Sequence, residues 1–211
     1  MAETVFRQWF LEGAREEWET VSLYDVLDIM SGGTPSTKQS EFWDGDIPWF
    51  TPKDVTDNPF CISTQKQITE LGLANCNSVL FKPGTFFVTA RGTVGKIAIC
   101  DVDMAVNQSC YALKSKFGLH FSFVYLLMKS AIRSIKQNAS GAVFDAIVVD
   151  TFKAIECTLP PADSDLYNDF VMICGPLFDK IRINTMHIAT IGSLRDTLLP
   201  RLISGELRVQ G

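Results

Sequence analysis

The chain has 211 residues, of which 46% are hydrophobic and 20% charged, and a formal net charge of −5 at pH 7. This composition excludes a disordered chain, and the length allows one medium domain plus an extended element, or at most two small domains. No run of about 18 apolar residues occurs, so we expect no membrane span. The negative charge argues mildly against a nucleic-acid partner.

The first 20 residues are predicted to form a short helix. Residues 4–18 place five apolar side chains on one side, namely Val5, Phe6, Trp9, Phe10 and Ala14. A helix of this length is marginal in water by itself, so its aromatic side chains must pack on another element. The long C-terminal helix described below is the expected partner.

Residues 21–161 are predicted to form one α+β domain with an irregular mixed sheet. Runs of β-branched, aromatic or alternating residues predict strands at 47–50, 79–81, 85–90, 96–100, 105–106, 110–114 and 154–159. Pro48 suggests that the first of these strands is an edge strand. One clear helix is expected over residues 121–137, and neither a tandem repeat nor a βαβ series is visible.

Residues 162–205 are predicted to form one long helix of coiled-coil type, followed by a tail at 206–211. The positions that carry this pattern are Phe170, Ile173, Leu177, Ile181, Asn184, Ile188, Ile191, Leu194 and Leu198. Their mean spacing of about 3.5 residues is typical of a seam between two helices. Asn184 lies in mid-seam, where one amide can fix register. Gly175 and Pro176 predict a kink or a break. The alternative is an amphipathic helix lying on its own domain.

The basic residues are concentrated in one part of the chain. Residues 80–140 contain eight Lys or Arg residues against Asp101 and Asp103, although the whole chain is acidic. This distribution permits a surface for a polyanion if the fold gathers the basic side chains. A solvated surface without a partner is the other interpretation.

Side chains suited to phosphates and base edges form the candidate DNA-binding set. Arg91 has the forked geometry that guanine requires, and Lys96 the charge for a phosphate. Asn107 and Gln108 are suited to adenine, or alternatively cap backbone groups inside the domain. The complete set is Thr34, Ser36, Thr37, Lys38, Lys53, Arg91, Thr93, Lys96, Asn107, Gln108 and Ser140.

Catalytic and metal-binding motifs were not found in the sequence. Residues 92–96 resemble half of a phosphate loop, but Ile97 stands where Ser or Thr is required. The six cysteines and two histidines show no zinc-ligand spacing, so we expect buried free thiols in a reducing cytoplasm and no metal site. We interpret the chain as non-catalytic, without a cofactor of its own.

Taken together, several segments resemble the specificity subunit of type I restriction–modification enzymes. These segments are SGGTPS at 31–36, FWDGDIPW at 42–49, ITELGL at 68–73, KPGT at 82–85, RGTVGK at 91–96, NQ at 107–108 and LRDTLLPRLISGEL at 194–207. Each motif by itself is modest, but their order and spacing run along the whole chain.

This resemblance implies a target-recognition domain that reads one half of a split site in double-stranded DNA, joined to a spacer helix. It also implies that spacer helices pair antiparallel and dock methyltransferase (modification) subunits and, through them, restriction subunits. Methylation and cleavage then belong to those other subunits, where S-adenosylmethionine is expected.

The family's usual chain carries two recognition domains and two spacers, whereas this chain carries one of each. Residues 2–10 resemble the end of a spacer that precedes a second recognition domain. The chain is therefore expected to be the C-terminal half of a longer subunit or a natural half-subunit, and to form a homodimer through its C-terminal helix. Two alternatives stay open: a scaffold that does not read DNA, and a small DNA-modifying enzyme with diverged motifs.

Overall fold

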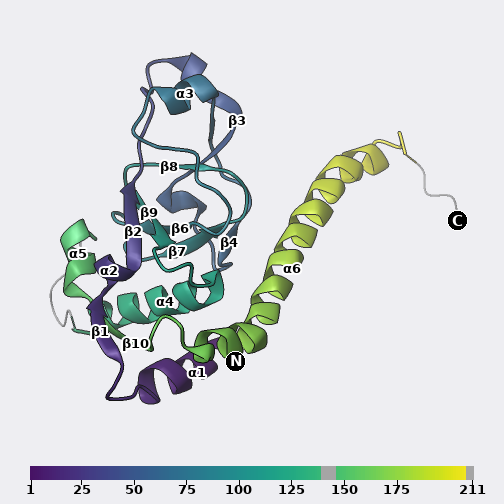
Figure 1. Cartoon of the computed structure of the whole chain (residues 1–211). Coiled ribbons are helices and arrows are strands. Elements are labelled where there is room, and N and C mark those ends of the chain that lie inside the picture. Colours follow the sequence, from purple (N-terminus) through teal and green to yellow (C-terminus); the bar gives the residue numbers. More distant parts are fainter. Residues whose placement is uncertain (139–145, 208–211) are drawn as a thin grey trace, which may run out of the picture.

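The computed structural model describes residues 1–138 and 146–207. Its elements are, in chain order, α1 (Ala2–Phe6), the π-helical turn η1 (Arg7–Glu12), β1 (Glu19–Ser22), α2 (Leu23–Val26), β2 (Leu27–Ser31), η2 (Ser40–Phe42), β3 (Trp43–Phe50), η3 (Pro52–Asp54), β4 (Phe60–Cys61), β5 (Gln67–Ile68), α3 (Glu70–Ala74), β6 (Phe86–Thr89), β7 (Ile97–Cys100), β8 (Ala105–Val106), β9 (Cys110–Ser115), α4 (Phe121–Asn138), α5 (Val149–Ala154), β10 (Glu156–Leu159) and α6 (Asp165–Ile203). The α+β class and the long C-terminal helix predicted from the sequence are confirmed (Figure 1). Within the described residues, no helix is long and apolar enough to cross a membrane.

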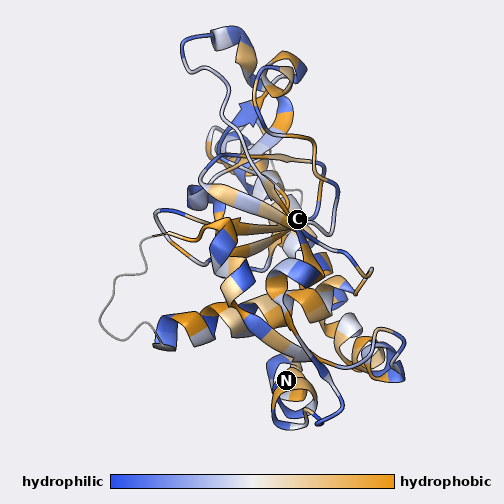
Figure 2. Ribbon diagram, turned by 60° about the vertical axis from the view of Figure 1, so that its left-hand side comes forward, coloured by the Kyte–Doolittle hydropathy of each residue, from blue (hydrophilic) through white to orange (hydrophobic). Residues whose placement is uncertain are grey.

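A five-stranded sheet in the order β2-β9-β6-β7-β4 forms the centre of the domain. Its pairs are antiparallel except for β4 and β7, which are parallel. Both faces of its middle strand are covered: Phe86 and Val88 join the cluster that includes α4, and Phe87 joins a second cluster with Phe50. This explains why β6 is apolar at consecutive positions rather than alternating. In Figure 2 the central strands are largely orange, and the helices below them alternate between orange and blue.

A smaller three-stranded sheet, in the order β5-β3-β8, corrects the prediction of an edge strand around Pro48. β3 is the middle strand of this sheet. Pro48 is tolerated because β8 pairs only with the next two residues, Trp49 and Phe50, so no partner needs an N–H at position 48. Pro48 itself pairs with Gln67 of β5, and the amide of the next residue, Trp49, donates to the Lys66 carbonyl at 3.0 Å.

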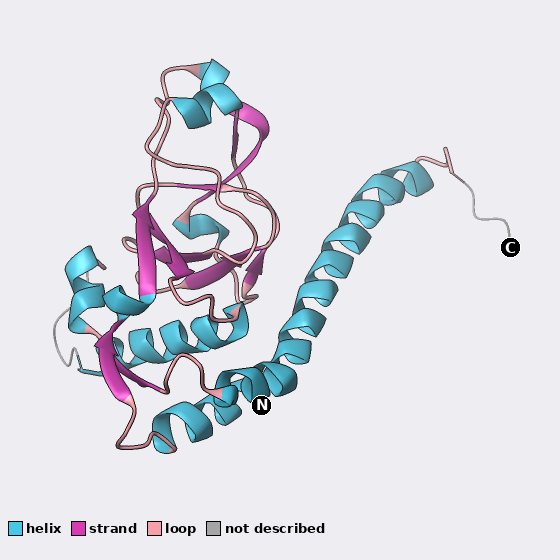
Figure 3. Ribbon diagram, viewed as in Figure 1, coloured by secondary structure: helices cyan, strands magenta, loops and turns pink. Residues whose placement is uncertain are grey.

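A two-stranded sheet joins the two ends of the domain. β1 pairs antiparallel with β10, from Glu19 opposite Leu159 to Ser22 opposite Glu156. The domain therefore begins about two residues earlier than predicted, and its first and last strands close it as one unit. Figure 3 shows α1, α2, α4 and α5 toward the base of this unit, long loops connecting the strands above, and α3 at the opposite end.

The N-terminal helix is shorter than predicted and packs against two other helices. It continues to Glu12, whereas residues 13–18 are not helical. Phe6 and Phe10 lie against Phe123 of α4 and Phe170 of α6, with ring centroids 4.8 to 6.1 Å apart. The expected contact of the N-terminal aromatics with the C-terminal helix is thus present.

Helix α6 is one uninterrupted helix of 39 residues. The Ser164 hydroxyl caps its start by accepting from the Leu166 amide at 3.3 Å. Gly175 and Pro176 do not break it, although Pro176 has no N–H for the carbonyl of Met172. The helix changes direction in its first part (Figure 1), so it is bent, in agreement with the predicted kink, but not broken.

Candidate nucleic-acid interface

The segment 106–109, between β8 and β9, is the point where three loops of the domain meet. The Gly33 amide donates to the Val106 carbonyl at 2.9 Å, and the Asn107 amide donates to the Phe50 carbonyl at 2.9 Å. The Ser109 carbonyl accepts from the amides of Ala90 and Arg91 at 2.8 and 3.3 Å. The loop after β2, the end of β3 and the β6–β7 turn are therefore held at one site. We call the predicted residues on these loops the candidate interface.

The loop after β2 is attached by close backbone contact and by one side-chain hydrogen bond. The half-buried Thr34 donates its hydroxyl hydrogen to the Gln108 side-chain oxygen, and the Ser36 carbonyl accepts from the Trp43 indole at 3.1 Å. Thr34 thus holds the loop in place. The side chains of Ser36, Thr37 and Lys38 are exposed.

We predict that Gly32→Ala will displace this loop. A β-carbon at Gly32 would lie 2.3 Å from the carbonyl oxygens of Val106 and Asn107, which are backbone atoms that cannot turn aside. The strain should cost about 1–3 kcal/mol in urea unfolding and weaken DNA binding. Gly192→Ala on α6, where a β-carbon meets nothing within 4 Å, is the matched control and should not be destabilising. Equal unfolding midpoints for both variants would contradict the close approach.

The β6–β7 turn presents Arg91, Thr93 and Lys96 as exposed side chains. Gly92 and Gly95 have φ angles of +78° and +75°, which explains the glycines of this turn. The Thr89 hydroxyl fixes the turn from inside, donating to the Thr93 carbonyl and accepting from the Lys96 amide at 2.9 Å. These contacts position the three side chains on a defined backbone.

Lys53 lies on η3, which is fixed by a capping box. The Thr51 amide donates to the Asp54 carboxylate at 2.7 Å, and the Lys53 amide donates to the Thr51 hydroxyl at 3.3 Å. A shallow open pocket of about 340 Å³ is lined by residues 52 and 55–57 after β3 together with Thr93 and Lys96. The segment that carries Lys53 therefore adjoins the β6–β7 turn.

For the side-chain oxygen of Asn107, the structure favours capping of the backbone over contact with a base. This side-chain oxygen accepts from the Ser109 amide at 2.9 Å, which caps the turn and occupies one of the two lone pairs of that oxygen. Gln108 is exposed beside it, with its own oxygen engaged by Thr34. Ser140 lies outside the described residues.

Lys136 is a residue that the candidate set missed. The β6–β7 turn packs so closely on α4 that a β-carbon on Gly95 would lie 2.8 Å from a methyl group of Ile132 and 3.3 Å from the Lys136 ammonium. Lys136 follows Ile132 by four residues and so lies on the same side of the helix. The sequence features that could have identified Lys136 are its four-residue spacing from Ile132 and its place in the basic segment 80–140.

The eight basic residues of that segment do not form one patch. Lys82 pairs with Asp103 at 2.5 Å, and Lys129 and Arg133 contact Glu3 at 2.5 and 3.6 Å. Lys116 lies over the Tyr24 ring at 5.0 Å, and Lys114 is its neighbour on β9. Among the described residues of the segment, Arg91, Lys96, Lys114, Lys116 and Lys136 have no ion-pair partner, and of these Arg91, Lys96 and Lys136 gather at the β6–β7 turn.

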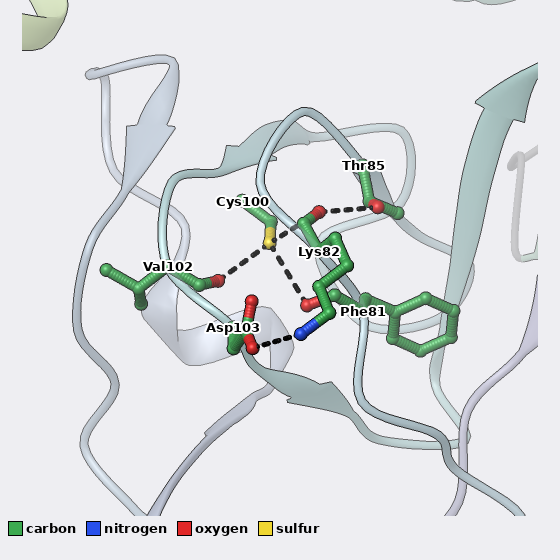
Figure 4. Close-up of polar contacts among 6 residues, drawn as sticks. All are labelled: Phe81, Lys82, Thr85, Cys100, Val102 and Asp103. Atoms are coloured by element: carbon green, nitrogen blue, oxygen red, sulfur yellow. Dashed lines mark hydrogen bonds and ion pairs between the residues drawn. The ribbon is translucent and has the colours of Figure 1, made fainter.

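The cysteines of the core are not suited to nucleophilic chemistry. The Cys100 thiol is enclosed by three carbonyls, with the Val102 oxygen at 2.9 Å and the Lys82 oxygen at 3.3 Å (Figure 4). Burial raises the pKa of this thiol to about 12, and that of Cys110 also to about 12. Both therefore stay protonated at neutral pH. No cluster of three or more potential metal ligands occurs among the described residues.

Helix α6 carries two exposed apolar faces besides its packed side. Phe170, predicted as a seam residue, is fully buried against the chain's own aromatic cluster, which corrects its assignment to a partner surface. The other predicted seam positions are exposed or half-buried, most strongly Ile188 and Ile191 at 70% and 65%. Met172, Ile183 and Met186 are also exposed and lie on another face, away from Phe170, by the helical spacing.

The fold is that of solved S subunits. The structure matches 98% of this chain to half of the HsdS subunit from Thermoanaerobacter tengcongensis, with a TM-score of 0.56 and 18% identity. It matches 95% of this chain to 49% of the type I restriction–modification S subunit from M. genitalium, with a TM-score of 0.60 and 15% identity. At such low identity these matches define a fold class, an α+β domain joined to a long helix.

The sequence comparisons go further. A family model described as the type I restriction modification DNA specificity domain matches residues 15–166, and the chain belongs to this family. The MjaIX specificity subunit of Methanocaldococcus jannaschii is 30% identical over 162 residues, which are 75% of this chain and 38% of that protein. The HindI specificity subunit of Haemophilus influenzae is 28% identical over 194 residues, 90% of this chain and 42% of that protein. The chain thus spans less than half the length of these relatives.

Proposed function

We propose that this chain supplies DNA sequence specificity to a type I restriction–modification complex, reading one half of a bipartite target with the candidate interface. The observation that carries the proposal is the convergence of three loops on residues 106–109 in a chain of the DNA specificity domain family. Arg91 would contact base edges, while Lys96 and Lys136 would contact phosphates. The chain itself would be non-catalytic, with S-adenosylmethionine bound by partner subunits.

Two contact regions on α6 fit two kinds of partner. The seam from Ile173 to Leu198 has the spacing for an antiparallel copy of itself, which would give a two-fold dimer with one recognition domain at each end. The face of Met172, Ile183 and Met186 would dock the methyltransferase subunits and, through them, the restriction subunits. A dimer of this kind implies a palindromic bipartite target, and the pairing of two domains adds avidity.

The proposed DNA contact is tested by removing charge at the β6–β7 turn. Arg91→Ala and Lys96→Ala should each weaken DNA binding by the complex with its modification subunits. The loss of affinity from Lys96→Ala should be uniform across DNA sequences, and the slope of log binding constant against log salt concentration should fall by about one. Arg91→Ala should in addition reduce the discrimination between bases at one position, by roughly 1–3 kcal/mol. Fluorescence anisotropy across a salt series measures both effects.

Lys82→Ala is the matched control, because it removes the same charge from the same basic segment at a site where Lys82 is paired with Asp103. Its binding should equal that of the unaltered chain. If Arg91→Ala and Lys96→Ala bind DNA as the control does, the assignment of the interface is wrong.

A further inference from the structure

Helix α6 is held against the recognition domain by two different kinds of contact. The first is apolar and lies in the first part of the helix, where Tyr167, Phe170, Cys174 and Phe178 are buried in the cluster that includes α1 and α4. The second is polar and lies further along, at residues 182 and 185. Pro176, where the helix lacks one backbone hydrogen bond and can bend, lies within the apolar region, two residues before Phe178.

The polar contacts tie α6 to the β4 and β7 edge of the central sheet. Arg182 meets the Asp101 carboxylate, just after β7, at 2.5 Å. The Asn58 side-chain amide, just before β4, donates to the Thr185 hydroxyl at 2.5 Å. Arg182 and Thr185 are three residues apart and so lie close together on the helix. Figure 1 shows the rest of α6 extending past β4 and away from the domain.

Both contacts are more enclosed than ordinary surface pairs. The Asp101 side chain is only 6% exposed, and Thr185 is the most C-terminal buried residue of α6 within the described chain. Burial raises the pKa of Asp101, and Arg182 opposes this by stabilising the charged form. Separating the helix from the sheet would leave this enclosed carboxylate without its partner, although Arg182 itself is 42% exposed, so the pair opposes that separation.

We infer that the Asp101–Arg182 and Asn58–Thr185 contacts form a clamp that sets the angle between the recognition domain and α6, and thereby restricts the half-site spacing that the protein accepts. The claim about half-site spacing rests on the proposed function, whereas the claim that the clamp sets the angle does not. The residues act by positioning and touch neither DNA nor a reacting group.

The geometry makes this angle important. From Thr185 to the helix end at Ile203 the rod extends about 27 Å, so a 10° change at the clamp moves its end by roughly 5 Å. One base-pair step of DNA is about 3.4 Å along a strand. An unclamped joint would therefore let two paired domains reach sites one base pair nearer or further apart.

The clamp is tested with Asp101→Asn, Thr185→Val and the double variant, all close to isosteric. Single-molecule energy transfer is measured between dyes at Glu70 on α3 and Ser193 on α6, introduced as keto amino acids because the chain contains native cysteines. Excess unlabelled chain keeps each labelled chain from pairing with another labelled one. Asp103→Asn, which removes the Lys82 pair instead, is the matched control.

The expected result is a distance distribution that broadens or shifts by at least about 5 Å in the double variant, and less in each single variant, while the control matches the unaltered chain. Urea unfolding identifies folded variants, and the single variants decide the matter if the double variant is unfolded. Distributions that superimpose on the control would overturn the clamp.

A second arm measures methylation by the assembled complex on targets whose spacer is one base pair longer or shorter. The unaltered chain should discriminate against both, and the double variant should lose at least about tenfold of that discrimination. A broadened joint with unchanged discrimination would overturn the role in spacing. If the unaltered complex shows no sequence preference at all, the proposed function fails while the distance measurement still decides the clamp.

Discussion

Replacing Ile188 and Ile191 together by glutamate is expected to convert a dimer into a monomer. The two side chains are 70% and 65% exposed in the single chain, and the antiparallel pairing proposed above would bury them twice in each dimer. Burial of an isoleucine stabilises by about 1.5–3 kcal/mol, so four of them account for a rise of about 10³-fold or more in the dissociation constant. Sedimentation equilibrium over a concentration series measures this change.

Ile183→Glu with Met186→Glu is the matched control for this experiment. It adds the same charge to the same helix, but on the face proposed for the modification subunits. This pair should leave the dimer intact and weaken co-purification with the modification subunits. A dimer that survives the Ile188 and Ile191 substitutions, or one lost equally in both variants, would show that the seam lies elsewhere.

The apolar positions of α6 keep one spacing, but they are buried in the domain at the start of the helix and exposed further along. The prediction from spacing therefore assigned Phe170 to the wrong surface. A 3.5-residue repeat records only that a stripe of the helix is apolar. It does not record whether that stripe meets the chain's own aromatic cluster, as at Phe170, or stays exposed, as at Ile188. The difference is made by Phe6 and Phe10, which are distant in sequence and close in the fold.

The central strands were predictable because their local sequence and their environment agree. β6 and β7 are rich in aromatic and β-branched residues, β9 carries Tyr111 among small and apolar residues, and all three are bounded by turn residues. β4 and β5, of two residues each, carry no period and exist through pairing with distant strands. These two strands are set by tertiary structure, and the sequence did not predict them, unlike the equally short β8, which was predicted at 105–106.

The candidate interface was predictable in its residue types but not in its assembly. Glycines, hydroxyls and basic residues marked the loops at 31–38 and 91–96. Their meeting at residues 106–109 depends on backbone hydrogen bonds, such as Gly33 to Val106, which any residue type can make. Lys136 was missed for a related reason, because only the packing of Gly95 on α4 brings it to the turn.

Phe170→Ala is expected to destabilise the chain by about 3–5 kcal/mol, the usual cost of deleting a fully buried aromatic side chain. Phe170 is 0% exposed, and its ring contacts those of Phe10 and Phe123 at centroid distances of 5.4 and 5.9 Å. The loss removes a side chain of α6 that contacts Phe6 of α1, Phe10 of η1 and Phe123 of α4 together. Urea unfolding should show a lower midpoint, and limited proteolysis should cut first near residues 1–18.

Phe117→Ala, at a ring that is 59% exposed, is the control and should change stability by no more than about 0.5 kcal/mol. Comparing the two changes in stability separates the effect of burial from that of residue type, because both substitutions replace a phenylalanine by alanine. Since α1 and the base of α6 share this aromatic cluster, a loosened Phe170 site should also weaken the dimer by misdirecting the helix. If Phe170→Ala unfolds at the same urea concentration as Phe117→Ala, then α1, α4 and α6 do not meet in one core. The aromatic cluster then cannot be what attaches the long helix rigidly to the domain.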